Sequence, residues 1–295
     1  MKRALVLTWL VVFAGLLGAG CGSTFRATRD FSLSEAWEDY ARIEVRTRNG
    51  RVELASGASE TITISGRKQA GGLTMAEAEE NVERLTIHAA ADEARPDTFV
   101  IELEYPEDLS DKSIGASFTI EIPAPCAADV KTSNGSIRVE QLLGPVALTT
   151  SNGRIEATSI DGDLRARSSN GRITAASVTG AVTLETSNGA VEVEDVHDAV
   201  DVQTSNGRIE ASVDPGQADH ITLRTSNGAI TLSLPSDLAA ELALDTSNGR
   251  INVGLSRAEL SVTEAERNHL HGTMNGGGCQ VTARTSNGAI NVKDR

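Results

Sequence analysis

The sequence is poor in aromatic residues, in cysteine and in basic charge, and each shortage excludes a class of protein. Aromatic residues make up 3% of the 295 residues, so a core built on Phe, Trp and Tyr is excluded and burial must come from aliphatic side chains. Three cysteines are too few and too scattered for a disulfide framework. The 27 basic side chains are outnumbered by 41 acidic ones, which argues against a nucleic-acid partner because such binding needs clustered Lys and Arg.

Residues 1–20 have the pattern of an export signal peptide. Two basic residues precede an apolar run over residues 4–17, and small residues follow at 18–20. The run is shorter than the ~20 apolar residues that a spanning helix needs. Cys21 follows directly, as in the bacterial lipobox, where the cysteine is acylated and becomes the mature N-terminus. We expect a lipid anchor on Cys21; ordinary secretion after cleavage is the alternative.

The anchor predicts the cellular location. Each buried methylene of an acyl chain contributes about 0.8 kcal/mol, so an acylated Cys21 would hold the protein at a membrane. We therefore expect a cell-envelope protein on the outer membrane, the periplasmic face or the cell surface. Residues 21–40 mix charged and small side chains without a period, and we expect a tether with little structure there.

The decisive feature is a motif, TSNG or SSNG, that recurs along the chain. Its glycines are Gly135, Gly153, Gly171, Gly189, Gly207, Gly228, Gly249 and Gly288, spaced by 18, 18, 18, 18, 21, 21 and 39 residues. A fixed period of this length indicates a repeat architecture. The last interval holds an insertion or a degenerate unit, and a related TRNG ends at Gly50.

Each repeat unit reads as β-strand on both sides of the motif. Val182 and Leu184 before one motif, and Val191 and Val193 after it, alternate with polar residues. Asn-Gly between such runs is also a hairpin signal, because both residues tolerate positive φ, so an antiparallel meander is the alternative. Equal spacing favours parallel stacking, since each apolar position then buries against its own copy.

We therefore predict an all-β fold: a parallel β-helix, or β-solenoid, of the right-handed kind with coils of about 18–21 residues and an irregular β-rich N-terminal cap. The expected organisation is a signal peptide over 1–20, a lipid-anchored tether over 21–40, the cap and first coils over 41–130, and the TSNG-repeat solenoid over 131–295. Within the cap, Thr74 and Glu77 have the spacing of a capping box and predict a helix running to about Arg84.

The motif asparagines are predicted to form a turn ladder that fixes the register of the coils. Each side-chain amide would bond to the next, for about 0.5–1.5 kcal/mol, against about 1.5–3 kcal/mol for each stacked isoleucine. The predicted ladder residues are Asn134, Asn152, Asn170, Asn188, Asn206, Asn227, Asn248 and Asn287.

Three sequence features resemble the DUF4097-type β-strand-repeat family of bacterial lipoproteins, which is related to adhesin-like head domains. They are the NG-x-I/V repeats, the SGRK after an early strand, and FTIEIPAPCAADVKTSNG at the entry to the repeats. The resemblance covers about residues 40–295. It implies a β-helical, surface-associated protein with no established catalytic activity and no family active site.

The residue after each motif glycine should face outward, and four of these are arginines: Arg154, Arg172, Arg208 and Arg250. Glutamates two positions further on share that face and can pair with them diagonally: Glu156, Glu192 and Glu210. A solvated face that serves solubility and register explains this pattern. The alternative is a surface that binds an anionic polysaccharide or a lipid headgroup.

The segment 254–278 departs most from the repeat. His269 and His271 would point the same way if extended, and with Cys279 they could supply three metal ligands. A mobile polar loop is the alternative, and we expect no metal. Cys279 and Cys126 either pair with each other or fill coil interiors as buried thiols.

Other binding chemistries find little support. Asp198 and Asp201 could meet a cation, but the pattern of calcium-stacking repeats is absent. An ice-binding threonine array is disfavoured, because threonines such as Thr186 and Thr204 have inward parity. No cluster of unique charged residues interrupts the repeat, so we expect neither an enzyme nor a cofactor.

The predicted function is that of a non-catalytic cell-envelope scaffold or adhesin-like binding module. Its expected partners are the membrane, through Cys21, and an envelope polysaccharide or protein. The alternative is a β-helix enzyme that acts on polysaccharide. The C-terminal strand is expected to leave an open edge, whose charged residues Lys293, Asp294 and Arg295 would oppose strand addition and keep the protein monomeric. The alternative is that this edge docks onto another copy, forming an oligomer, or onto another protein.

Overall fold

The computed structural model describes residues 25–295 except 39, 58–59, 217 and 257. The expected signal peptide and Cys21 lie outside the described residues. The chain divides into two compact units, Met1–Leu142 and Leu143–Arg295. We call them unit 1 and unit 2 and describe each by itself.

Unit 1 consists of nine strands, one α-helix and one short 3-10 turn within its described residues. The strands are β1 (Phe25–Ala36), β2 (Arg42–Arg46), β3 (Val52–Ser56), β4 (Thr61–Gly72), β5 (Thr86–Ala91), β6 (Thr98–Glu104), β7 (Gly115–Ile122), β8 (Ala127–Lys131) and β9 (Ile137–Leu143). The helix is α1 (Met75–Glu83), and the 3-10 turn is η1 (Glu107–Leu109).

The strands of unit 1 form two sheets that mix parallel and antiparallel pairs. One sheet has the order β1-β4-β7-β3-β9 and the other β5-β6-β2-β8. β3 is parallel to both β7 and β9, and β2 is parallel to both β6 and β8. The early coil formed by β2 and β3, which contains the TRNG sequence, therefore lies between strands that come later in the chain.

The expectation of little structure over 21–40 is wrong for most of that segment. β1 (Phe25–Ala36) pairs along its whole length with β4 in antiparallel register. Ala27 is buried, and the ring of Phe31 packs edge-on against Phe118 with centroids 5.7 Å apart. Phe25, Ala27, Phe31 and Leu33 alternate with polar residues, which is a strand signal that the expectation of a tether overlooked.

The helix predicted from the capping box is present. Thr74 is the N-cap and its hydroxyl accepts from the Glu77 backbone N–H at 3.1 Å. The Glu77 carboxylate accepts from the N–H of Leu73 at 2.7 Å, one residue before the cap. These two bonds satisfy amides at the helix start that have no partner within the helix.

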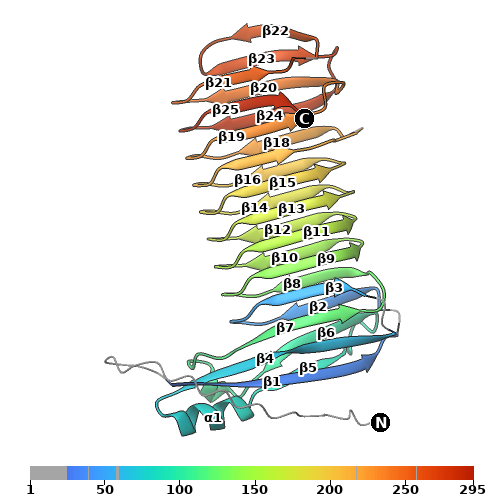
Figure 1. Cartoon of the computed structure of the whole chain (residues 1–295), viewed down its shortest axis with the longest axis vertical. Coiled ribbons are helices and arrows are strands. Elements are labelled where there is room, and N and C mark those ends of the chain that lie inside the picture. The colour runs from blue at the N-terminus through green and yellow to red at the C-terminus, as the bar shows by residue number, and fades with distance from the viewer. Residues whose placement is uncertain (1–24, 39, 58–59, 217, 257) are drawn as a thin grey trace. The chain divides into compact units, whose positions relative to one another are not determined.

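Unit 2 is the regular part of the solenoid (Figure 1). Its strands are β10 (Val146–Thr150), β11 (Ile155–Asp161), β12 (Leu164–Ser168), β13 (Ile173–Val178), β14 (Val182–Glu185), β15 (Val191–Val196), β16 (Val200–Gln203), β17 (Ile209–Ser212), β18 (His220–Arg224), β19 (Ile230–Leu234), β20 (Ala240–Thr246), β21 (Ile251–Gly254), β22 (Leu260–Ala265), β23 (His269–Met274), β24 (Cys279–Thr285) and β25 (Ile290–Asp294). Each coil contributes one strand to each of two sheets.

The coils of unit 2 stack in parallel register, which confirms the solenoid and excludes the antiparallel meander. Ile173 lies beside Ile155 on one side and Val191 on the other, and the same position pairs in the following coils. These side chains are completely or almost completely buried. Each such residue contributes about 1.5–3 kcal/mol by burial, so the aliphatic stack is the main source of stability.

The motif glycines are required by close packing between coils. A Cβ added at Gly171 would lie 1.6 Å from the carbonyl oxygen of Gly153, and one at Gly189 would lie 1.9 Å from that of Gly171. Neither glycine has a positive φ. The hairpin interpretation, in which the Asn-Gly pair is chosen because it tolerates positive φ, is therefore wrong for this motif. The corner needs glycine because there is no room for a side chain.

The last coil of the chain is not the last coil of the stack. β24 pairs with β18 on one side and β20 on the other, and β25 pairs with β19 and β21. The expected open C-terminal edge is therefore wrong, because β25 is an inner strand. The outermost strands of unit 2 at this end are β21 and the antiparallel hairpin β22–β23, which the long last interval encodes.

Candidate functional site

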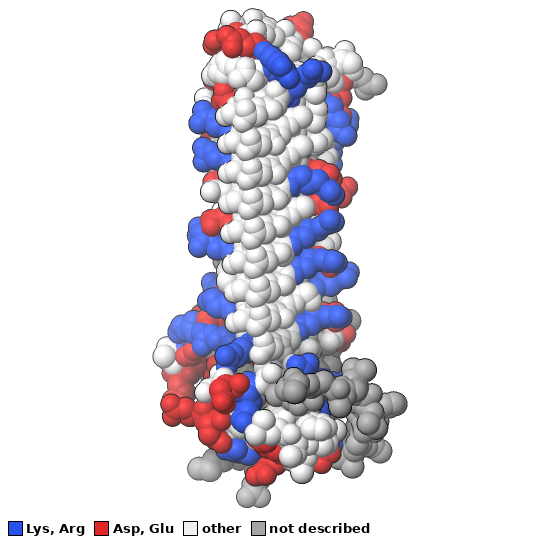
Figure 2. Space-filling model, turned by 90° about the vertical axis from the view of Figure 1, so that its left-hand side faces the viewer, with Lys and Arg blue, Asp and Glu red and all other residues white. Residues whose placement is uncertain are grey.

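The candidate site is the repeat corner, which we define as the exposed Ser-Asn pairs of the motif in unit 2. Every one of these side chains is exposed. In stacking order they are Ser151-Asn152, Ser169-Asn170, Ser187-Asn188, Ser205-Asn206, Ser226-Asn227, Ser286-Asn287 and Ser247-Asn248. Figure 2 shows this side of the molecule as an uncharged band with Lys and Arg along both flanks.

The asparagines of the corner form a continuous ladder. The Nδ2 of Asn170 donates to Asn152 Oδ1 at 2.7 Å, and each following amide donates in the same direction at 2.7–2.8 Å. At the end of the stack the ladder runs Asn227, Asn287, Asn248, because the last coil of the chain lies between the two coils that precede it in the sequence. In unit 1, Asn134 donates to Asn49 at 2.6 Å, so the TRNG asparagine belongs to a ladder as well.

The threonines of the motif lie on the inner side of the corner. Thr186 and Thr204 are buried, and their hydroxyls donate to the carbonyls of Gly171 and Gly189 at 3.1 Å. The corner serines face outward, and within the described chain their hydroxyls make no hydrogen bond to the protein. The corner therefore offers a row of free hydroxyls beside a row of oriented amides.

Arginines flank the corner on both sides. The four that follow the motif glycines are exposed, as parity predicted: Arg154, Arg172, Arg208 and Arg250. On the other flank, the residues before the motif add three more: Arg167, Arg224 and Arg284. Sequence reasoning missed this second set, although the position before the motif is equally regular.

Glutamates and one aspartate pair with most of these arginines. Arg172 reaches Glu192 of the next coil at 3.0 Å, which is the expected diagonal pair, whereas Arg154 pairs with Glu156 of its own strand at 3.1 Å. These exposed pairs are each worth a few tenths of a kcal/mol. Within the described chain, Arg224 and Arg250 have no ion-pair partner.

A shallow polar groove follows the corner over its last coils. Its volume is about 550 Å³, and it runs past the outward residues Gln203, Arg224, Arg284 and Asp245 of the adjoining sheet. Asp245 is the one carboxylate among its lining residues. The groove is open along its length and lined by hydroxyls, so it suits an extended ligand.

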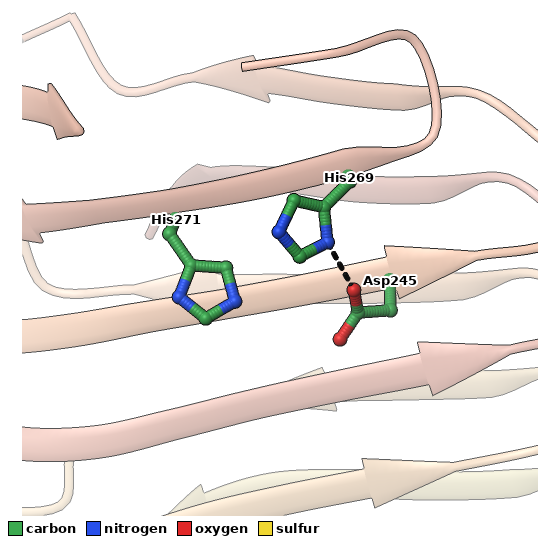
Figure 3. A group of neighbouring side chains, drawn as sticks. All are labelled: Asp245, His269 and His271. Atoms are coloured by element: carbon green, nitrogen blue, oxygen red, sulfur yellow. Dashed lines mark hydrogen bonds and ion pairs between the residues drawn. The ribbon is translucent and has the colours of Figure 1, made fainter. Parts of the chain in front are cut away.

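His269 lines the groove and His271 lies two residues further along β23; their rings stack with centroids 4.6 Å apart. His269 Nδ1 is hydrogen-bonded to the Asp245 carboxylate of β20 (Figure 3). That hydrogen bond raises the pKa of His269. The segment is thus an ordered hairpin rather than a polar loop, and Asp245, not Cys279, completes the group of possible ligands.

Both described cysteines are free and buried. Desolvation raises the pKa of the Cys126 thiol to about 11, and burial also raises that of Cys279. Thiols with raised pKa values are poor nucleophiles at neutral pH. Buried packing, rather than a disulfide, is the role that the structure gives them.

Asp198 and Asp201 do not belong to a group of three possible metal ligands among the described residues. Asp198 accepts from the backbone N–H of Ala199 at 2.6 Å. The cation site that these two aspartates could have formed is therefore not assembled.

Comparisons with known proteins found one family and several solved structures. The profile of the family described as Toastrack DUF4097 matches residues 40–293. A candidate adhesin of Bacteroides fragilis is 12% identical over 92% of this chain and 98% of its own, with a TM-score of 0.46. A candidate cell adhesion protein of Clostridium sporogenes is 10% identical over 90% of this chain and 100% of its own, with a TM-score of 0.25.

Among curated proteins, no relative matches the chain. Within the described residues, no helix has the length and apolarity to cross a membrane.

Proposed function

This chain belongs to the Toastrack DUF4097 family, and from that premise we propose that it is a non-catalytic, adhesin-like binding module of the cell envelope. The repeat corner of unit 2 is its binding surface, and an acidic polysaccharide is its partner. The observation that carries the proposal is the row of exposed Ser-Asn pairs between two flanks of arginine.

The chemistry of the corner fits a sugar polymer with anionic groups. Free serine hydroxyls and the amide protons outside the ladder can bond to sugar hydroxyls, and guanidinium groups bind carboxylates or sulfates through paired donors. The groups recur at the strand spacing of about 4.8 Å. A polymer that lies along the stack meets a Ser-Asn pair on each coil and an arginine on most coils, so weak individual contacts add up by multivalency.

The charge distribution supports the same partner. The chain carries a net charge of −14, which repels polyanions in general. In unit 2 the turns opposite the corner carry the aspartates Asp163, Asp198 and Asp214, whereas the motif itself contains no acid. An anionic polymer is therefore directed to the corner and away from the opposite turns.

The lining of the groove does not hold the pair of acids that a glycosidase uses. Glycoside hydrolysis uses two carboxylates on either side of the scissile bond. Asp245, the one carboxylate lining the groove, is already bonded to His269 and to Arg284, whose Nε lies 3.2 Å from Asp245 Oδ2. The lining of the groove thus offers a place to bind a polymer and includes no second carboxylate.

The expected anchor on Cys21 completes the proposal by placing the module on a membrane. Replacing Cys21 by serine removes the acylated thiol while leaving the described residues unchanged. The variant should move from the membrane fraction to the soluble fraction of the cell envelope. If Cys21→Ser stayed in the membrane fraction, the lipid anchor on Cys21 would be contradicted, and the proposal for the binding surface would be unaffected.

The binding proposal is tested with polygalacturonate, an acidic polysaccharide, and with dextran as the neutral polymer. Affinity electrophoresis or calorimetry should show binding of polygalacturonate alone, weakening with added salt. The variant Arg172→Ala/Arg208→Ala/Arg224→Ala should lose about tenfold or more in affinity.

A control variant with the same change in net charge distinguishes binding at the repeat corner from nonspecific electrostatic attraction. Arg51→Ala/Arg67→Ala/Arg84→Ala removes three exposed arginines of unit 1 and should bind polygalacturonate as the wild type does. Equal losses in both triple variants, or no binding by the wild type, would refute the assignment of the corner.

A further inference from the structure

The hairpin β22–β23 brings together side chains that the repeat does not use. Across the pair β20–β23, Asp245 lies opposite His269 and Ala243 lies opposite His271. Residues two apart on a strand share one face, and directly opposed residues have Cβ atoms about 4.5–5.5 Å apart. Leu242 and Leu244 of β20 are buried, so Asp245 and both histidines point to the outer face.

We propose that Asp245, His269 and His271 form a binding site for a divalent transition-metal ion of the zinc class. One possible ligand atom from each of the three residues lies within 4.8 Å of the other two. Tetrahedral zinc with ligand bonds of about 2.0–2.2 Å has ligand atoms roughly 3.4 Å apart. Small rotations of partly exposed side chains close that difference, while both strands stay in place.

The donor set selects the class of metal. Two imidazoles and one carboxylate are typical of zinc, whereas calcium and magnesium bind through oxygen alone. Arg284 Nε lies 3.2 Å from Asp245 Oδ2, so Asp245 binds the ion through its other oxygen, the one that faces His269. A single carboxylate oxygen and two imidazole nitrogens leave at least one coordination position open.

Glu264 of β22 is placed to orient His269 for the ion. Its Oε2 lies 3.4 Å from His269 Nε2, the ring nitrogen on the other side from the Nδ1 that faces Asp245. One imidazole ring binds the ion through one nitrogen, so Glu264 accepts from Nε2–H while Nδ1 faces the ion. A metal held by Asp245, His269 and His271 connects β20 and β23, and Glu264 supports it from β22, the outermost strand of their sheet.

The metal would therefore fasten the hairpin that ends the stack. Binding to the folded hairpin and not to the open one stabilises it by mass action. β22 is exposed along most of its length and includes Val262, which is 45% exposed. An edge strand with so little burial is held chiefly by its pairing with β23, so a cross-strand ion has a large local effect.

The test uses the full chain without a polyhistidine tag, titrated with Zn²⁺ against a chromophoric chelator. One equivalent should bind, and calcium or magnesium in large excess should not displace it. His271→Ala and Asp245→Asn should each weaken binding by about tenfold or more. His220→Ala, an exposed histidine on β18, is the matched control and should bind zinc normally.

Hydrogen exchange gives a second readout that does not depend on the affinity of the variants. Zn²⁺ should slow amide exchange in residues 260–274 of the wild type and of His220→Ala, and a chelator should reverse the effect. In His271→Ala the exchange should not respond to Zn²⁺. Undiminished zinc binding by His271→Ala, or no zinc binding by the wild type at micromolar concentrations, would overturn the proposal.

Discussion

Replacing Gly171 by alanine tests the packing on which the solenoid depends. The new Cβ would lie 1.6 Å from the carbonyl oxygen of Gly153, and real Cβ atoms essentially never come within 3.0 Å of such an atom. The two coils would have to separate locally by roughly 1.4 Å, the difference between these distances.

The structure resists that separation. Ser168 donates its hydroxyl to the Gly153 carbonyl at 3.1 Å, and Asn170 donates to Asn152 at 2.7 Å, so both bonds join the two coils that would separate. Loss of two or three such bonds costs about 1–4 kcal/mol, and overpacking adds about 1–3 kcal/mol. We expect Gly171→Ala to lower the free energy of unfolding by about 3–5 kcal/mol.

Urea unfolding followed by circular dichroism measures this loss. Gly254→Ala is the control, because a Cβ at Gly254 has its nearest neighbour, the Val292 carbonyl oxygen, at 3.9 Å. The control should change the free energy of unfolding by less than about 1 kcal/mol. If Gly171→Ala were as stable as Gly254→Ala, the close approach of the coils at the motif glycine would be refuted.

Three further predictions concern the asparagine ladder, the positive φ of Ser159 in β11 and the buried carboxylate of Glu44. Asn188→Ala removes bonds to Asn170 and from Asn206 and should cost about 1–3 kcal/mol in urea unfolding, whereas Ser187→Ala should be neutral. Ser159 has a φ of 57° within β11, so Ser159→Gly should stabilise the protein by about 0.5–1 kcal/mol in the same assay; a loss of stability would contradict this. A hydrogen bond from Arg95 lowers the pKa of Glu44, so the stability of the wild type relative to Glu44→Gln should be full above about pH 4.3 and disappear as the pH falls through the lowered pKa; a difference that persists in acid unfolding curves would contradict it.

The register of the coils could be predicted from the sequence, but the order of the terminal coils could not. Equal spacing predicts that similar units stack with equivalent residues side by side, and every pair of neighbouring coils satisfies this whichever two units it contains. The motifs at Gly228, Gly249 and Gly288 fit one another equally well, so local pattern does not determine which two are adjacent. The insertion of the last coil depends on how the hairpin β22–β23 redirects the chain, which no periodicity encodes.

The two candidate sites differ in the same way. The arginines after the motif could be predicted, because a period of two fixes which side chains face outward. The participation of Asp245 beside His269 could not, because it follows from the antiparallel register of two strands joined by irregular sequence. Cys279 was a plausible ligand by sequence distance, but it pairs opposite Ala240, at the other end of β20 from Asp245.

The stacking of coils in register, with the last coil inserted, is tested most directly by cysteine cross-linking at the corner. Asn287 donates to Asn227 at 2.7 Å, whereas Asn248 lies one coil further away. Adjacent parallel strands are about 4.8 Å apart, within the Cα range of about 4.4–6.8 Å for a disulfide, and next-nearest strands are about 10 Å apart. The account predicts that Asn227→Cys/Asn287→Cys oxidises to a disulfide and that Asn227→Cys/Asn248→Cys does not. The reverse result would contradict it.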